Sequence, residues 1–156
     1  MSKSLNRVRA ALEAAGLAVE IRQTGDQTRT ARQAAAVVGC ALDQIVKSMI
    51  FRGAESGELM LFLTAGGNQV QEGKAAALAG EPLTRADAAD VRARTGFAIG
   101  GVAPVGHINP IRAFADTHLI GFDRVWAAAG TPHHLFAIAP AALVALTGAE
   151  PGDFTR

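Results

Sequence analysis

Hydrophobic positions at the start of the chain follow a helical period. Apolar residues three or four apart predict an opening helix that Gly16 terminates, with its buried face made by Leu5, Val8, Leu12 and Ala15. A short strand is expected next, over residues 18–23. Thr30 and Gln33 have the spacing of a capping box, in which the threonine hydroxyl accepts from the third amide and the glutamine reaches back. A second helix is therefore expected to begin after Thr30 and to end at Gly39.

Apolar runs with the length and composition of strands recur through the rest of the chain. Neighbouring strands over residues 45–53 and 57–67 are joined by a turn of Gly, Ser and acidic residues. Further strands are expected over residues 111–116, 124–129 and 134–139, separated by Gly/Pro turns. Sequential strands of this kind favour hairpins and a sheet that is largely antiparallel.

Helices are expected between and after these strands. Asn68 has the position of a cap for a helix that ends at Leu78. The Thr84-x-x-Asp87 pattern opens the next helix, and Pro140 is a favourable first residue for the last one. Helices and strands interleave irregularly, which favours a mixed α/β (α+β) fold over a doubly wound sheet.

Composition and length predict one soluble, cytoplasmic domain over residues 1–156. A chain of this length can bury a sizeable core, and no apolar run approaches the roughly 20 residues of a membrane span. The charged, helix-patterned N-terminus does not have the pattern of a secretory signal. The single cysteine, Cys40, excludes an internal disulfide and fits a reducing compartment. The glycine-rich signatures of dinucleotide-binding and P-loop folds are absent.

Charge is nearly balanced overall but uneven along the chain. The net charge of +1 argues against a protein that coats nucleic acid or DNA generally. Residues 1–52 nevertheless carry eight Lys/Arg against four Asp/Glu. This basic first third either faces a phosphate-bearing partner over a limited area or forms solvated helix faces.

Lys47 is a charged residue in an apolar strand. Alternation places it on the same strand face as Ile45, Met49 and Phe51, and the opposite face is also mainly apolar. Lysines are seldom buried without a partner, because desolvating an ammonium costs several kcal/mol. Two interpretations remain open: the stem extends to the rim of the sheet, or the ammonium points into a cavity that receives an anion or a polar substrate.

An uncharged loop over residues 100–107 has the sequence Gly-Gly-Val-Ala-Pro-Val-Gly-His. Glycine allows a ligand to approach the main chain, and Pro104 stiffens the loop. Convergent amides can hold a carboxyl, an ester carbonyl or a phosphate, and can stabilise an oxyanion. The donors would be the amides of Gly100, Gly101, Val102, Ala103, Val105, Gly106 and His107. The alternative is a plain Gly/Pro connection.

Other catalytic patterns are weak. No Ser-His-Asp order, Cys-His pair or carboxylate pair stands out. The four histidines lack the spacing of a zinc site, so neither a metal nor a cofactor is expected. A lysine with many amides suits electrostatic catalysis of an acyl transfer in which substrate or water supplies the nucleophile.

At these residues the sequence resembles the YbaK/prolyl-tRNA synthetase-associated editing domain family. The resemblance lies in the lysine of "IVKSMIF", the strand "LMLFLTAG", the loop "GGVAPVGH", Asp116 after "IRAFA", and the C-terminal "AAAGTPHHLFAIAPAALVALTGA". The order and spacing of these segments cover nearly the whole chain. The resemblance implies one domain with a barrel-like, mostly antiparallel sheet flanked by helices.

The resemblance also implies an activity and a set of roles. A free-standing trans-editing deacylase would hydrolyse the ester of mischarged tRNA at its acceptor end, without a cofactor, and tRNA(Pro) is the expected carrier. Lys47 stands at the position of the family's required lysine, with Gly100 and Gly101 as carbonyl or oxyanion contacts. The terminal ribose hydroxyl is the proposed helper or nucleophile. Substrate-binding positions would be Ile45, Ser48, Val102, Ala103, Pro104, Val105, Gly106, His107 and His134.

Supporting residues and partners follow from the same resemblance. Asp116 is expected to hold loop amides in place and, with Thr30, to support the site without touching substrate. His134 either gates the amino-acid pocket or is an ordinary turn residue. Ala103 and Val105 suggest a small pocket, for alanine, cysteine, serine, threonine or 2-aminobutyrate. Prolyl-tRNA synthetase is a possible partner. The alternative function is a non-catalytic module of the same fold that binds aminoacyl-tRNA or a synthetase.

Overall fold

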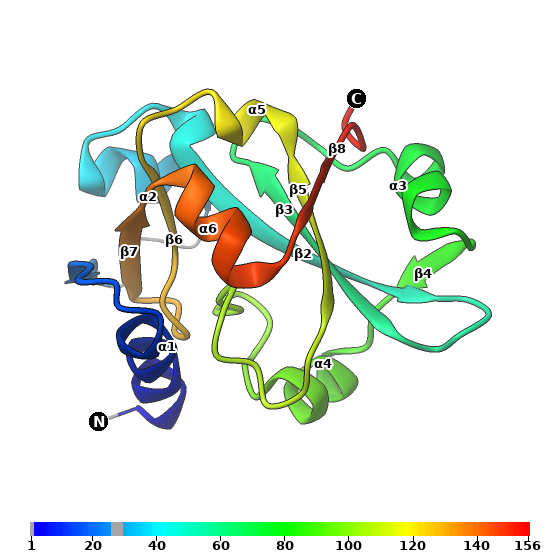
Figure 1. Ribbon diagram of the computed structural model, residues 1–156, viewed down its shortest axis with the longest axis horizontal. Coiled ribbons are helices and arrows are strands. Elements are labelled where there is room, and N and C mark those ends of the chain that lie inside the picture. Colours follow the sequence, from blue (N-terminus) through cyan, green and yellow to red (C-terminus); the bar gives the residue numbers. More distant parts are fainter. Residues whose placement is uncertain (1, 26–29) are drawn as a thin grey trace.

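An eight-stranded sheet forms the centre of the protein, and helices surround it (Figure 1). The computed structural model describes residues 2–25 and 30–156. The strands lie in the order β1-β7-β6-β2-β3-β5-β8, and β4 pairs with β2 outside this path. Their bounds are β1 (Ile21–Gln23), β2 (Ile45–Gly53), β3 (Leu59–Ala65), β4 (Leu83–Arg85), β5 (Arg112–Asp116), β6 (Val125–Ala128), β7 (His134–Ile138) and β8 (Glu150–Gly152).

Strand directions in the sheet are mixed. β2 pairs antiparallel with β3 and β4, and β7 pairs antiparallel with β1 and β6. The β2–β6, β3–β5 and β5–β8 pairs are parallel. The predicted class, a mixed and mostly antiparallel α/β fold, is confirmed. The sheet is open rather than closed into a barrel, because β1 and β8 lie at its two ends and do not pair with each other in the part of the chain described.

Local sequence signals account for most of the helix boundaries. The helices are α1 (Lys3–Ala14), α2 (Ala31–Val38), α3 (Glu72–Ala79), α4 (Ala88–Thr95), α5 (Thr117–Ile120) and α6 (Pro140–Thr147). The capping box of α2 is present: the Thr30 hydroxyl accepts from the Gln33 amide at 3.1 Å, and the Gln33 side chain accepts from the Thr30 amide at 3.2 Å. Gly39 ends this helix in the left-handed conformation.

The helix after β3 begins later than predicted. α3 starts at Glu72, and the side chain of Gln71 caps it by accepting from the Lys74 amide at 2.7 Å. Asn68 does not cap this helix, because its side-chain amide donates to the Asp116 carboxylate at 2.9 Å. The side chain that the local pattern assigned to a cap therefore forms a hydrogen bond with a residue distant in the sequence instead.

Further elements differ from the prediction. α4 begins after Asp87 and not at Thr84, which lies in β4. The short elements β4, α5 and β8 were not predicted. α5 spans four residues and the two strands span three each, too few positions for a hydrophobic period to identify.

The larger core lies on one face of the sheet, here called the main-core face. α1, α4 and α6 contribute buried side chains to it, and β2 contributes Val46. Leu61 and Leu63 of β3 are fully buried in the same core. Residues of the loop that follows α4 also belong to it, since Val102 and Ala103 are buried there. The glycine loop is thus packed against the sheet.

The opposite face, here called the lysine face, carries Ile45, Lys47 and Met49 of β2. α2 packs over one end of this face around Trp126, and α3 packs over the other end around Phe62. Figure 1 shows α2 and α3 at opposite ends of the sheet. Met49 is 39% exposed, so the middle of the lysine face is less covered than its two ends.

Candidate functional site

One edge of β2 is only partly paired. On one side, β3 pairs with this strand from Val46 to Arg52. On the other side, β6 pairs only with Ile45 and Val46, and β4 pairs only with residues 51–53. In the part of the chain described, no strand covers this edge over residues 47–50. We call this segment the edge gap; Figure 1 shows β6 and β4 on either side of it.

Ser48 lies inside the edge gap and has an unpaired hydroxyl. Backbone groups of alternate strand residues point to the same side, and the Gly53 amide donates toward the β3 side, to the Glu58 carbonyl at 2.8 Å. Ser48 therefore directs its backbone N–H and C=O away from β3, into the gap. Its hydroxyl oxygen is buried and has no hydrogen-bond partner among the described residues. An unmet buried hydroxyl costs about 1–3 kcal/mol, which indicates a position that a ligand or water completes.

The Lys47 ammonium is held by a turn of the protein. It donates to the main-chain carbonyl of Asn68, in the turn that follows β3. The side chain is only partly exposed, and its cross-strand neighbour Thr64 is fully buried. A protein carbonyl therefore fixes the ammonium, and the charge does not extend freely into solvent at the rim of the sheet.

Two opposing effects act on the charge of Lys47. Burial is the larger effect and lowers the pKa of the lysine below its usual value. The carboxylates of Asp116 and Asp43 attract the ammonium and oppose this shift. The site therefore holds a cation that is less well solvated than a surface lysine and that a substrate anion could stabilise further.

Asp116 fixes the turn that holds Lys47. The carboxylate is 3% exposed and accepts from the Ala65 amide at 3.0 Å and the Asn68 side-chain amide at 2.9 Å. Its second oxygen accepts from the His118 amide at 3.0 Å. Asp116 thus holds main-chain amides, as the sequence suggested, but they belong to the end of β3 and the start of α5 and not to the glycine loop.

Most amides of the glycine loop, residues 100–107, are unpaired. The Gly101 amide donates to the Ala98 carbonyl at 3.0 Å and is part of a turn. The other loop amides donate no hydrogen bond to any residue in the described part of the chain. Ala103 is fully buried, and buried amides without an acceptor are rare in native proteins. The loop retains the donors that an ester carbonyl or a carboxylate accepts from.

The two glycines at the start of the loop differ in their surroundings. Gly100 has a φ of +94°, and a Cβ there would meet nothing within 4 Å. A Cβ on Gly101 would lie 3.1 Å from the Thr131 main chain and 3.2 Å from the Pro132 ring. Gly101 therefore allows the loop to pack against the turn between β6 and β7. Of this pair, only Gly100 keeps the unpaired amide that an oxyanion contact requires.

Lys47 and the glycine loop lie on opposite sides of β2. The loop packs with Val46 on the main-core face, whereas Lys47 points to the lysine face. Within the residues described, no hydrogen bond joins the two. Ser48 points to the same side as Val46, toward the loop. The edge gap is the stretch of β2 where no strand separates the lysine face from the main-core face on which the loop packs.

The second half of the loop is tied to itself. His107 Nε2 pairs with the Ala103 carbonyl at 2.8 Å, and the ring packs edge-on against Phe97 with centroids 5.6 Å apart. Burial lowers the pKa of His107. A shallow groove of about 390 Å³ runs along the outer side of this half, and loop residues Pro104, Val105, Gly106 and His107 line it together with parts of α1 and α6.

Three further predicted residues have other partners in the fold. His134 Nδ1 pairs with the Thr131 hydroxyl at 2.6 Å, in the turn against which Gly101 packs. Burial lowers the pKa of His134, with smaller electrostatic contributions from His133 and Arg9. Ile45 is buried under α2 on the lysine face. Thr30 is exposed at the start of α2 and acts there as its cap.

Comparison with known proteins shows which family has this architecture. A family model described as the aminoacyl-tRNA editing domain matches residues 26–146. The chain belongs to this family. The matched residues include Lys47, the glycine loop, Asp116 and His134, so all elements around the edge gap lie inside the editing domain.

Several relatives share the editing domain's sequence or fold. The Bacillus subtilis (strain 168) protein YwhH is 28% identical over 121 residues, which cover 78% of this chain and 76% of that protein. The crystal structure of a candidate trans-editing enzyme for prolyl-tRNA synthetase is 47% identical with a TM-score of 0.94, over 100% of this chain and 99% of the other. The structure of protein APE2540 is 29% identical with a TM-score of 0.88, over 96% and 99% of the two chains.

Two absences concern only the described part of the editing domain. No group of three or more His, Cys, Asp and Glu side chains lies close enough there to hold a metal ion. No helix there is long and apolar enough to cross a membrane.

The sequence did not identify two polar residues that support Lys47. Asp43 accepts from the Gly67 amide at 2.8 Å and from His118 Nε2 at 3.0 Å, and Asn68 supplies the carbonyl for the ammonium. Asp43 lies in the short 3-10 helix Leu42–Gln44 and Asn68 lies in the turn after β3, and Asp and Asn are common at such positions for local reasons. No pattern along the chain separates these two from ordinary turn residues.

Proposed function

We propose that this editing domain is a trans-editing deacylase that removes a small non-cognate amino acid from mischarged tRNA, with tRNA(Pro) as the carrier. Family membership supports an aminoacyl-tRNA substrate. The 47% identical structure of a candidate trans-editing enzyme for prolyl-tRNA synthetase supports the choice of tRNA and of that synthetase as a partner. The observation that carries the proposal is the edge gap, where the unpaired hydroxyl of Ser48 follows the partly buried ammonium of Lys47, together with the unpaired amides of the loop on the main-core side of the sheet.

The reaction needs no side-chain nucleophile. A water molecule, with or without help from the terminal ribose hydroxyl, adds to the ester carbonyl carbon, and the carbonyl oxygen becomes an oxyanion. The bond from that carbon to the ribose oxygen then breaks, and the departing oxygen takes up the proton that the water loses. The Gly100 amide and the buried loop amides would donate to the oxyanion, an effect that typically contributes about 10²–10³ in rate for one donor.

Lys47 would act as a cation and not as a base. Its ammonium would bind the phosphate or sugar of the terminal adenosine and would stabilise charge that develops at the ester. Bound at the edge gap, an anionic group would offset the desolvation that lowers the pKa of Lys47. Asp116 and Asn68 would hold the ammonium in place before the substrate arrives.

Small side chains on the loop side of the gap would limit the size of the amino acid. Ala103 and Val105 are buried there, and Ser48 adds a small polar group. The expected substrates carry alanine, cysteine, serine, threonine or 2-aminobutyrate. One methylene changes discrimination by about 1–3 kcal/mol, so we expect graded preferences among these amino acids.

A deacylation assay tests the proposal. Purified tRNA(Pro) is charged separately with alanine, cysteine, serine, threonine or 2-aminobutyrate, and release of the amino acid is followed with the protein and with buffer. We expect release above the buffer rate for at least one of these tRNAs. Release at the buffer rate for all of them, together with retained binding of aminoacyl-tRNA, would support the non-catalytic module instead.

Ser48→Ala is expected to separate stability from activity. Removal of a buried, unpaired hydroxyl should leave the free energy of unfolding unchanged or raise it, since nothing in the described residues pairs with that oxygen. If the hydroxyl bonds the substrate, kcat/KM for the preferred tRNA should fall about tenfold, the value of one hydrogen bond. Urea unfolding and steady-state kinetics measure the two effects. A destabilised variant with full activity would contradict the assignment.

Two arginines on the lysine face are expected to contact tRNA phosphates. The guanidinium carbons of Arg22 and Arg124 lie 4.9 and 5.1 Å from the ring centroid of Trp126, on the face toward which Lys47 points. Phosphates that precede the terminal adenosine would pass over this face. Arg124→Ala should raise KM, leave kcat unchanged and make the slope of log KM against log salt shallower by about 0.7–0.9.

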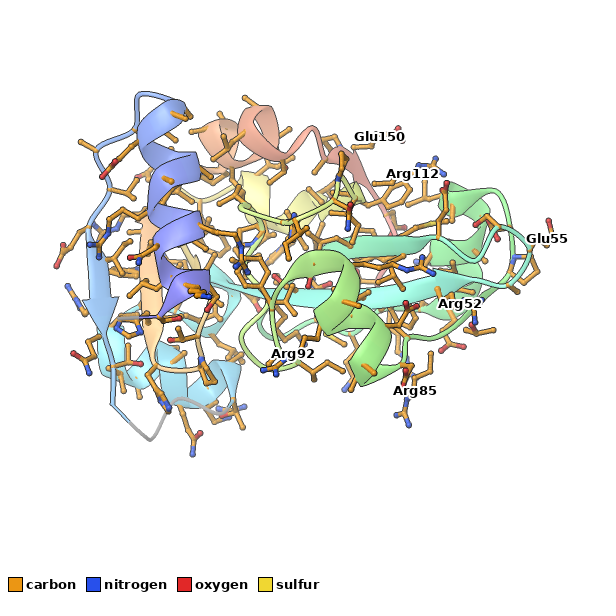
Figure 2. All side chains as sticks on the ribbon, turned by 90° about the horizontal axis from the view of Figure 1, so that it is seen from below. Arg52, Glu55, Arg85, Arg92, Arg112 and Glu150 are labelled. Carbon is orange, nitrogen blue, oxygen red and sulfur yellow. The ribbon has the colours of Figure 1, made fainter. Side chains whose placement is uncertain are left out.

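Arg92→Ala is the matched control for that measurement. Arg92 is exposed on α4, which covers the main-core face (Figure 2). Its removal should leave the salt slope unchanged. An equal change of slope in both variants would mean that the effect reflects overall charge and not a contact on the lysine face.

A further inference from the structure

α1 contacts two turns, the one between β6 and β7 and the one at the end of the glycine loop. A Cβ on Gly130, in the turn between β6 and β7, would lie 2.8 Å from the Ser4 carbonyl oxygen. A Cβ on Gly106, at the end of the glycine loop, would lie 3.1 Å from the main chain of Arg7 and Val8. The two glycines thus permit direct contact between the α1 backbone and both turns. The family model matches from residue 26 onward, so this helix lies outside the matched segment.

Arg7 joins the end of α4 to the last turn of the glycine loop. Its Nε donates to the Gly106 carbonyl at 3.2 Å, and another guanidinium nitrogen donates to the Gly96 carbonyl. The guanidinium carbon lies 5.1 Å from the centroid of the Phe97 ring, over its face. Gly96 is the C-cap of α4 and lies shortly before the loop. One side chain therefore bonds main-chain carbonyls on both sides of residues 97–105.

The loop needs the contacts from Arg7 because its own amides form almost no hydrogen bonds that would stabilise it. Gly101 donates to Ala98, but the remaining amides of residues 100–107 have no acceptor in the described part of the chain. A loop that leaves its donors unpaired gains little rigidity from its own backbone. The contacts from Arg7 bind one carbonyl before the loop and one near its end, and they leave the amides free to face a ligand.

We infer that Arg7 is a positioning residue that holds the amides of the glycine loop in the geometry required for hydrolysis of the ester. The inference rests on the proposed function for its catalytic consequence. Its structural part, that Arg7 orders the loop, is independent of the substrate. Planar guanidinium geometry is required, since a single ammonium at this position could reach one of the two carbonyls but not both.

Kinetics and hydrogen exchange test the inference together. Arg7→Ala should lower kcat about tenfold to a hundredfold, the size of effect expected when reacting groups are displaced by about 1 Å, with a smaller change in KM. Amide exchange in peptides that cover residues 97–107 should become at least about tenfold faster, because local opening becomes easier. Added guanidinium ion should restore part of the lost kcat, whereas Arg7→Lys should keep the fold and recover only part of the activity.

Controls distinguish the possible failures. Arg92→Ala, on the exposed side of α4, should change neither kcat nor exchange in the loop. If the wild type hydrolyses none of the mischarged tRNAs, the proposed function fails, and the exchange measurement still decides whether Arg7 orders the loop. Unchanged loop exchange in Arg7→Ala would overturn the inference. Faster loop exchange with unchanged kcat in an active enzyme would also overturn it. If Arg7→Ala does not fold, the same measurements on Arg7→Lys apply.

Discussion

Replacement of Lys47 by methionine is expected to abolish deacylation without unfolding the protein. Loss of a cation at the reacting ester should lower kcat about 10²–10³-fold, the range for removal of one electrostatic contact. Stability should be unchanged or higher near neutral pH. Burial is the larger of the two influences on the charge of this lysine, and the attraction of Asp116 and Asp43 is the smaller, so the pKa is lowered in the folded state.

The pH dependence of unfolding gives a second measurement on Lys47. Because its pKa is lower in the folded than in the unfolded state, the unfolded chain binds more protons over the pH range between the two values. The wild type should therefore gain stability as pH rises through that range, which ends near the ordinary lysine value of about 10.4. Lys47→Met should lack this gain. Urea unfolding at several pH values measures it.

Lys74→Met is the matched control for Lys47. Lys74 lies on α3, is exposed and pairs with Asp153 at 3.1 Å. Its replacement should leave kcat unchanged. A Lys47→Met variant that is strongly destabilised but fully active would show that the lysine has a structural role only and that the edge gap is not the active site.

Replacement of Asp116 by alanine is expected to affect both stability and activity. Three donors, the amides of Ala65 and His118 and the side chain of Asn68, would lose their acceptor in a buried position. Breaking a buried charged network of this kind typically costs about 3–5 kcal/mol, which corresponds to a Tm lower by roughly 6–20 °C for a domain of this size. kcat should also fall, because the Asn68 carbonyl no longer holds the Lys47 ammonium.

Asp116→Asn removes the negative charge of this residue and keeps the shape of its side chain. The carboxylate raises the pKa of Lys47, so its neutralisation should lower that pKa further. We expect the high-pH limb of the activity profile to move to lower pH in this variant. Asp153→Asn, a substitution at an exposed carboxylate that pairs with Lys74 of α3, should leave the profile in place. An unchanged profile in Asp116→Asn would show that Lys47 does not act through its charge.

Much of the secondary structure is readable from local patterns. Thr30, Gln33 and Gly39 mark the two ends of α2, and Pro140 marks the start of α6, because caps depend on residues within one turn of each other. Asn68 misled the prediction of α3 for the opposite reason. Its side chain forms a hydrogen bond with Asp116, 48 residues away, and a local sequence pattern does not extend that far.

The candidate site, like the secondary structure, could be predicted only in part from the sequence. Lys47 is conspicuous along the chain because a charge interrupts an apolar strand, and the glycine loop is conspicuous because it lacks both charge and bulk. The sequence could not show that they lie on opposite sides of β2, or that the Gly101 amide is used within the loop. Those facts depend on which face of β2 the loop packs against and on the conformation of the loop itself.

The sequence by itself determined the fold class and most of the elements, and it singled out the two parts of the candidate site. These follow from hydrophobic period, capping chemistry and the cost of placing a lysine in a strand, all of which act over a few residues. Only the tertiary structure decided that one edge of β2 is left uncovered over residues 47–50, that Asp116 bonds the residue whose carbonyl holds Lys47, and that Arg7 bonds both Gly96 and Gly106. These depend on residues tens of positions apart, whose distances are set when the sheet forms and its neighbours pack against it.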